Sequence, residues 1–165
     1  MEIRIAGETV FDSIVDGTGL RAVIFTQGCK HHCFECHNRQ TWDFNGGVIR
    51  ETDKIVREIL ANPLDKGVTF SGGDPFEQSL KCLDIVLKLK SKGYSDFWAY
   101  TGYQWEALLE DSDRSQFLKE LNVLVDGRFI LEQKSLTLNF RGSSNQRIID
   151  VQKSLSQKSV VLLPL

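Results

Sequence analysis

The chain has 165 residues, of which 41% are hydrophobic and 25% are charged, and its net charge is −2. This composition is typical of one globular domain, and the charge excludes a general attraction to nucleic acid or to an anionic membrane. The N-terminus does not read as a signal peptide, and no apolar run is long enough to cross a bilayer. We therefore expect one cytoplasmic domain over residues 1–165, without nucleic-acid or membrane partners.

Strand and helix patterns alternate along the chain. Short apolar runs predict strands, and a periodicity of 3.6 residues predicts helices between them. The predicted strands are Arg21–Thr26, Val68–Phe70, Phe97–Tyr100 and Val123–Val125. The predicted helices are Thr52–Leu60, Pro75–Lys92, Trp105–Leu109 and Ser115–Leu121.

Finer features of these elements can also be predicted. The inner stripe of the second helix is expected to consist of Phe76, Leu80, Leu83 and Leu87. Asp113 and Gln116 are spaced as a capping box for the last helix. Farther along, Leu136–Phe140 alternates like a strand, Arg147–Val151 fits a strand or a helix, and the C-terminal VVLLPL fits a final strand.

The alternation of strands and helices predicts an α/β fold with a mainly parallel sheet covered by helices. In such folds the chemistry lies at the carboxyl ends of the strands. The unusual loops of this sequence fall at those ends, because GCKHHCFECHN, SGGDP, TGY and DGR each follow a predicted strand. We therefore expect these loops to form a single site.

Three cysteines form the most informative motif. Cys29, Cys33 and Cys36 have the spacing C-x3-C-x2-C, and Gly28 permits a sharp turn before the first of them. Three thiolates this close in sequence can converge on one metal centre, and thiolates select zinc, copper(I) or iron–sulfur clusters. The same spacing also fits a helical stripe, but the apolar pattern does not continue on either side.

A zinc site and a four-iron cluster differ in their fourth ligand. Structural zinc needs four closed ligands, so it would have to use His31, His32 or His37, since Cys82 lies among the core residues of a predicted helix. A four-iron cluster normally takes four thiolates. With three, one iron keeps an open position that can bind a substrate directly, as catalytic zinc does. The sequence favours the cluster.

The segment SGGDP follows a strand and opens a helix. Asp74 as the N-cap and Pro75 at the first helical position explain its second half without any function. They do not explain Gly72 and Gly73, which indicate close approach of a ligand near a helix N-terminus. The glycines of Asp16–Gly19 precede a strand instead of following one, so they do not form a dinucleotide-binding loop.

The C-x3-C-x2-C spacing resembles the hallmark of the radical S-adenosylmethionine (SAM) superfamily. The resemblance implies that Cys29, Cys33 and Cys36 hold one 4Fe-4S cluster, whose open iron binds the amino and carboxylate groups of SAM. It also implies reductive cleavage of SAM to methionine and a 5′-deoxyadenosyl radical, which abstracts a hydrogen atom.

Two loops are expected to bind the cofactor on the same grounds. SGGDP is similar to the family's GGEP-type loop, which contacts the SAM amino group, and this implies cofactor binding by Gly72, Gly73 and Asp74, with Asp74 in place of the usual Glu. In the cysteine loop, the resemblance implies that SAM's adenine passes close to three residues: Glu35, Cys36 and His37.

Other segments resemble the activating enzymes of glycyl radical proteins. Two segments are similar to segments of such enzymes: DGTGLR and CHNRQTWDFNGG. Two others resemble signatures of the proteins that activate anaerobic ribonucleotide reductases: RGSSNQRIID and LVDGRF. The resemblance implies a shortened, open βα barrel, a glycine of the large reductase subunit as the hydrogen donor, and an electron donor such as reduced flavodoxin. No general base is required, so we assign no catalytic side chain.

Other functions remain open from the sequence. An activase of the pyruvate formate-lyase type is favoured by CHNRQTWD, but not by RGSSNQR or by the short chain. A non-enzymatic iron–sulfur electron carrier would gain nothing from the glycine pair of SGGDP. A zinc-dependent binding module lacks a second pair of ligands, and a nucleic-acid module would show a basic face.

Overall fold

A computed structural model describes residues 1–165, which form one eight-stranded mixed sheet and five α-helices. The strands are β1 (Glu2–Ile5), β2 (Val10–Ser13), β3 (Arg21–Thr26), β4 (Val48–Glu51), β5 (Gly67–Gly72), β6 (Phe97–Tyr100), β7 (Val123–Asp126) and β8 (Arg147–Asp150). The helices are α1 (Thr52–Leu60), α2 (Ser79–Lys90), α3 (Trp105–Glu110), α4 (Ser112–Lys119) and α5 (Val151–Gln157). Short 3-10 turns are η1 (Arg39–Thr41), η2 (Pro75–Gln78) and η3 (Leu131–Gln133).

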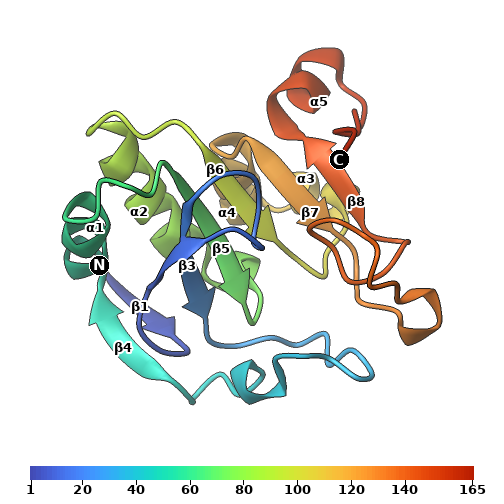
Figure 1. Ribbon diagram of the computed structural model, residues 1–165, viewed down its shortest axis with the longest axis horizontal. Helices are drawn as coiled ribbons and strands as arrows, with labels where there is room; N and C mark the ends of the chain where they lie inside the picture. The colour runs from blue at the N-terminus through green and yellow to red at the C-terminus, as the bar shows by residue number, and fades with distance from the viewer.

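The strand order along the sheet is β4-β1-β3-β5-β6-β7-β8, and β2 pairs with β3 (Figure 1). The central strands β3, β5, β6 and β7 are parallel, so their carboxyl ends meet at one edge. The outer strands β1, β2, β4 and β8 pair antiparallel. The expected α/β fold with an open, mainly parallel sheet is confirmed, and antiparallel strands extend this parallel centre on both sides.

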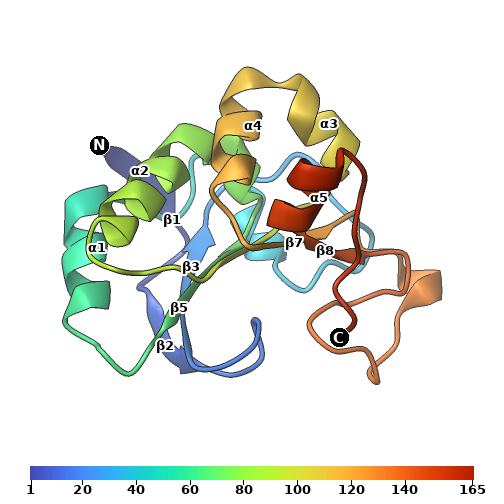
Figure 2. The same ribbon diagram turned by 90° about the horizontal axis from the view of Figure 1, so that it is seen from above.

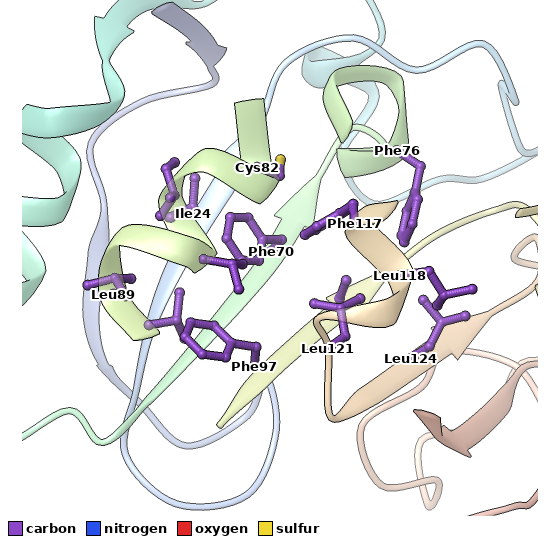
Figure 3. Packing of buried hydrophobic residues seen from close by; sticks show 14 of the residues in the cluster. Ile24, Phe70, Phe76, Cys82, Leu89, Phe97, Phe117, Leu118, Leu121 and Leu124 are labelled. Atoms are coloured by element: carbon purple, nitrogen blue, oxygen red, sulfur yellow. The ribbon is translucent and has the colours of Figure 1, made fainter. Parts of the chain in front are cut away.

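All five helices lie on one face of the sheet (Figure 2). Between the sheet and the helices is a cluster of 24 buried hydrophobic residues. Figure 3 shows Phe70 and Phe97 of the sheet packed beneath α2, with Phe117 from α4 against them. The rings of Phe70 and Phe117 meet edge to face at 5.3 Å. This cluster fixes one face of the parallel strands and leaves their carboxyl edge free for the loops.

The predicted inner stripe of the second helix is wrong beyond Phe76 and Leu83. Leu80 and Leu87 are 41% and 48% exposed, whereas the buried residues of α2 include Cys82, Ile85, Val86 and Leu89. The cause is the turn η2, which precedes α2 and has about three residues per turn instead of 3.6. This difference rotates the following α-helix relative to the phase that a continuous helix would have.

The C-terminal part of the chain differs from the expectation in two places. Leu136–Phe140 forms no strand, and Leu136 is 92% exposed. The final VVLLPL makes only an isolated bridge between Leu162 and Ile149. Between these two places lies Arg147–Val151, for which the sequence allows a strand or a helix. The structure contains both, because β8 is antiparallel to β7 and α5 begins at Val151.

The cap of α4 is also different from the prediction. Asp111 is the N-cap, and its carboxylate accepts a hydrogen bond of 2.9 Å from the backbone N–H of Arg114. The helix therefore starts at Ser112, before the predicted Asp113–Gln116 box.

The face of the sheet without helices carries a smaller apolar cluster and a buried charge. Arg21 of β3 is fully buried, and its guanidinium donates to the Asp96 carboxylate at 2.7 Å and to the Thr69 hydroxyl at 2.8 Å. The same group lies 5.2 Å from the ring centroid of Trp98.

No helix of the structure is long and apolar enough to cross a membrane.

Candidate functional site

The loops that follow β3, β5, β6 and β7 surround one cavity of about 210 Å³. The structure therefore brings together the four loops that the sequence singled out. From the cysteine loop, the cavity is lined by Cys29, His31, Cys33, Cys36, His37 and Asn38. From the other loops, it is lined by Ser71–Gly73, Tyr100–Gly102 and Gly127–Phe129, together with Gly142 and Gln146.

The three cysteines of the motif are all free thiols at this cavity. Cys29 is buried, whereas Cys33 and Cys36 are partly exposed. Gly28 has the positive φ of +106° that the predicted sharp turn requires. The turn is fixed by the following segment, since Gly28 N–H donates to the Thr41 carbonyl at 2.7 Å and Cys29 N–H donates to the Trp42 carbonyl at 3.1 Å.

This set of donors fits an iron–sulfur cluster. No three His, Cys, Asp or Glu side chains lie close enough together to hold a single metal ion. A four-iron cluster does not need such convergence, because its ligands surround a body wider than one ion. Three thiols around a cavity that also admits a ligand are the soft donors that such a cluster takes.

Burial and backbone N–H groups act in opposite directions on the pKa of two of these thiols, and burial has the larger effect. Burial raises the pKa of Cys29 to about 11, and the backbone N–H groups of His31 and His32 oppose this rise. Burial also raises the pKa of Cys33, and the backbone N–H of Phe129 opposes it. Because the thiolate is the ligand, each of these N–H groups stabilises the form that binds metal.

The glycine pair of SGGDP lies at the cavity wall and packs against two other backbone segments. A Cβ on Gly72 would lie 2.6 Å from the Thr26 backbone, and a Cβ on Gly73 would lie 2.5 Å from the Gly28 carbonyl oxygen. Gly73 N–H donates to the Thr26 carbonyl at 2.7 Å, and Asp74 N–H donates to the Gly28 carbonyl at 2.9 Å. Contact between segments of the protein therefore already requires the two glycines, apart from any ligand.

Asp74 is 1% exposed and joins three loops through its carboxylate. As the N-cap of η2, it accepts a hydrogen bond of 3.0 Å from the backbone N–H of Phe76. It also accepts bonds from the Thr101 hydroxyl at 2.9 Å and from Gly102 N–H at 3.0 Å. Its Oδ2 lies 2.7 Å from Nε2 of His31. The carboxylate does not line the cavity, because partners within the protein surround it.

His31 connects the cysteine loop to the loop after β6. Its side chain is 4% exposed, and its ring lies so close to Gly102 that a Cβ there would be 2.5 Å from a ring carbon. The ring also meets Tyr103 edge to face at 4.5 Å. From the sequence, His31 is only one of three possible zinc ligands, whereas the structure makes it a link between two loops of the site.

Glu35 and His37 have different positions relative to the cavity. His37 lines it, and its ring centroid lies 5.3 Å from that of Phe129. Glu35 points away into an exposed ion pair with Arg39 at 3.5 Å and does not line the cavity.

The sequence suggests no individual role for several lining residues, namely Thr101, Gly102, Arg128, Phe129 and Gln146. The signal that could have found most of them is their position, because they follow directly after predicted strands or lie in the RGSSNQR segment. Their roles depend on contacts between loops, and no spacing within one loop encodes such contacts.

Comparison with known proteins gives consistent matches. A family model described as "4Fe-4S single cluster domain" matches residues 15–149. The chain is similar to the anaerobic ribonucleoside-triphosphate reductase-activating protein of Vibrio cholerae, with 38% identity over 82% of this chain and 90% of the relative. The corresponding protein of Haemophilus influenzae is 35% identical, with the same coverage of both chains.

A relative from Escherichia coli K12 with the same name is 34% identical over 81% of this chain and 90% of its own. Among solved structures, the crystal structure of QueE from Escherichia coli has a similar fold, with a TM-score of 0.54 and 16% identity. The match covers 76% of this chain and 71% of QueE.

Proposed function

Because this chain belongs to the family of anaerobic ribonucleoside-triphosphate reductase-activating proteins, we propose that it activates an anaerobic ribonucleotide reductase. The single observation that carries the proposal is the convergence of the cysteine triplet and the SGGDP loop on one cavity. When bound at this cavity, a 4Fe-4S cluster would supply the electron for reductive cleavage of SAM to methionine and a 5′-deoxyadenosyl radical, and a glycine of the reductase would be the hydrogen donor. The single domain of residues 1–165 carries this activity.

The proposed cluster ligands are Cys29, Cys33 and Cys36, which line the cavity from one loop. The protein holds this loop by the backbone bonds from Gly28 and Cys29 to the segment that follows it. It also directs the backbone N–H of Asn38 toward Cys36 Sγ at 3.4 Å, which lowers the free energy of that thiolate.

The proposed SAM contacts come from two sides of the cavity. Gly72 and Gly73 present backbone groups at its wall. Asp74 belongs to the same loop, and its carboxylate keeps that loop against His31 and Gly102. On the other side, the adenine would lie beside the cysteine loop near Glu35, Cys36 and His37, of which Cys36 and His37 line the cavity.

The proposed entry for the reductase glycine is a second hollow of about 390 Å³, which shares His37, Ser71, Tyr100 and Gly142 with the cavity. Its apolar lining includes Val15 and Leu136, which are 72% and 92% exposed. Exposed apolar side chains beside a site indicate a surface for a protein partner. The electron would come from a reduced carrier such as flavodoxin.

The test uses anaerobically purified protein reconstituted with iron and sulfide. We expect dithionite and SAM to give 5′-deoxyadenosine, and addition of the large reductase subunit to give a glycyl radical signal by electron paramagnetic resonance (EPR). Bound iron without 5′-deoxyadenosine would support the electron carrier instead. If 5′-deoxyadenosine forms and the radical appears only on a pyruvate formate-lyase, the partner assignment is wrong.

The proposed entry has its own variant. Leu136→Asp should lower the yield of glycyl radical per 5′-deoxyadenosine by about tenfold, as for loss of one apolar contact in an interface. Leu64→Asp is the matched control, because Leu64 is also exposed, at 66%, and lies outside the hollow. Equal yields from the two variants would exclude this entry.

A further inference from the structure

The segment Ser143–Gln146, here called the brace, binds the backbone of the loop that follows β7. Three of its side chains make these bonds: Ser143 Oγ accepts from Ile130 N–H at 3.2 Å, Asn145 Nδ2 donates to the Arg128 carbonyl at 2.8 Å, and Gln146 Nε2 donates to the Gly127 carbonyl at 3.0 Å. The loop Gly127–Ile130 contains no helix or strand. Side chains of the brace thus provide the hydrogen bonds that a neighbouring strand would otherwise provide.

The brace is itself held in one conformation. Gln146 Oε1 accepts hydrogen bonds from the backbone N–H groups of Gly142 at 2.8 Å and Ser143 at 3.2 Å. The Arg141 guanidinium donates to the Gln146 carbonyl at 2.6 Å and to the Ser144 carbonyl at 3.2 Å. Ser143 is fully buried. The groups that reach the loop are therefore fixed before any ligand or partner binds.

The loop held by the brace faces a cysteine of the motif. Cys33, Arg128 and Phe129 line the same cavity, so the Arg128 side chain and the Phe129 backbone lie in the wall that surrounds this thiol. The Phe129 ring packs against Gly142, where a Cβ would lie 3.1 Å from it.

An N–H donor and a positive charge beside a cluster sulfur affect the two redox states differently. The reduced cluster carries one more negative charge than the oxidised one, so both groups stabilise it more strongly. Hydrogen bonds to the sulfurs and net charge are among the factors that set the reduction potential of such clusters.

We infer that the brace is a positioning device for the cluster: Ser143–Gln146 holds the Phe129 backbone and the Arg128 charge in the cavity wall beside Cys33 and thereby raises the cluster's reduction potential. This inference rests on the proposed function, because it takes Cys33 as a cluster ligand. It assigns a role to RGSSNQR and to LVDGRF, neither of which binds the cofactor in the proposed function.

The first measurement is amide hydrogen exchange in the cluster-free protein. Asn145→Ala and Gln146→Ala should each increase the exchange rate of the Gly127–Ile130 peptide by several-fold, because each removes a bond to this loop. Gln133→Ala is the matched control, since the Gln133 side chain accepts a hydrogen bond from Ser144 Oγ without contacting the loop. If Gln146→Ala unfolds the protein, Gln146→Glu removes only the donor to Gly127 and keeps the acceptor.

The second measurement is the midpoint potential of the reconstituted cluster, determined by an EPR-monitored redox titration. The brace variants should shift it to more negative values, and Gln133→Ala should not. Arg128→Gln should shift the potential in the same direction without changing hydrogen exchange, because it removes the charge and leaves the backbone in place.

The outcomes separate this inference from the proposed function. Unchanged hydrogen exchange in both brace variants would contradict the claim that the brace holds the loop Gly127–Ile130. Faster exchange with an unchanged midpoint potential would contradict the claim that the brace affects the cluster. A wild-type protein that takes up no cluster would instead overturn the proposed function, and the exchange measurement would still report on the brace alone.

Discussion

Cys82 and Cys29 are both buried, but they lie in two regions that treat a thiol differently. Cys82 is on α2 in the helix-covered core, where its only polar contact is the Pro75 carbonyl at 3.6 Å, and burial raises its pKa far above the ordinary value. Cys29 lies at the loop edge of the sheet, beside a cavity and two backbone N–H groups. Burial alone therefore does not distinguish the two thiols, whereas a cavity lined by two further cysteines does.

The largest expected effect tests this contrast directly. Cys33→Ala should abolish both iron binding and 5′-deoxyadenosine formation, because two thiolates cannot hold the cluster. Cys82→Ala should retain both and should cost only about 1 kcal/mol of unfolding free energy for the lost packing. Iron content, product analysis and urea denaturation measure the three quantities.

Loss of the cluster in Cys82→Ala would contradict the division into two regions. It would mean that a thiol of the helix-covered core is a ligand, and the assignment of the triplet would have to be revised.

The next effect concerns Asp74, where the two regions meet. Asp74→Ala leaves the donors of Phe76, Thr101 and Gly102 without an acceptor in a buried position. We expect a loss of about 3 kcal/mol or more of unfolding free energy in the cluster-free protein, since each unsatisfied buried group costs about 1–3 kcal/mol.

Asp111→Ala provides the matched control for this variant. Asp111 is also an N-cap, but it is exposed and accepts only from Arg114 N–H, so its loss should cost about 1 kcal/mol. Equal costs for the two variants would show that Asp74 serves only as a cap and does not join the loops.

A smaller effect is expected on the face of the sheet without helices. Arg21→Lys keeps the charge but loses the fork of donors that reaches Asp96 and Thr69, so it should cost about 1–2 kcal/mol by urea denaturation. As a control, Arg57→Lys should leave the free energy of unfolding almost unchanged, because Arg57 is exposed on α1. If both changes are neutral, the buried guanidinium contributes nothing that an ammonium group cannot supply.

The smallest effect concerns the rim of the loop region. Arg147 holds the pKa of Glu106 below its ordinary value of 4.5, and the Glu106 side chain is 60% exposed. A lowered carboxyl pKa stabilises the fold at pH values above the ordinary one, and this contribution disappears as the pH falls through the lowered value. Glu106→Gln should therefore cost about 0.5 kcal/mol or less at pH 7, and this cost should decrease as the pH is lowered toward 3. A larger cost at pH 3 would contradict the ion pair.

The central part of the fold could be predicted from the sequence because its signals are local. The strand Arg21–Thr26 and the helix Thr52–Leu60 have the predicted bounds, since each has a clear periodicity. The stripe of α2 could not be predicted, because the short turn before the helix changes its phase. The antiparallel strands β1, β2 and β4 are not predicted, because each has only four residues in which a periodicity could show.

The site was predictable to the level of loops, but not to the level of most contacts. Parallel strands bring their carboxyl ends to one edge, so the convergence of the cysteine loop and SGGDP follows from topology. The partners of Asp74 could not be predicted, because His31 is 43 residues away and Thr101 is 27 residues away along the chain. The brace is equally non-local, since Gln146 contacts Gly127.

The close packing of the His31 ring on Gly102 has an evolutionary consequence. A methyl group at position 102 would overlap the imidazole ring, so position 102 cannot gain a side chain while position 31 keeps its ring. Across related genes, residues 31 and 102 should substitute in a correlated manner. A side chain should appear at 102 only in lineages where 31 has become small, and Gly102→Ala should be tolerated in this protein only together with such a change.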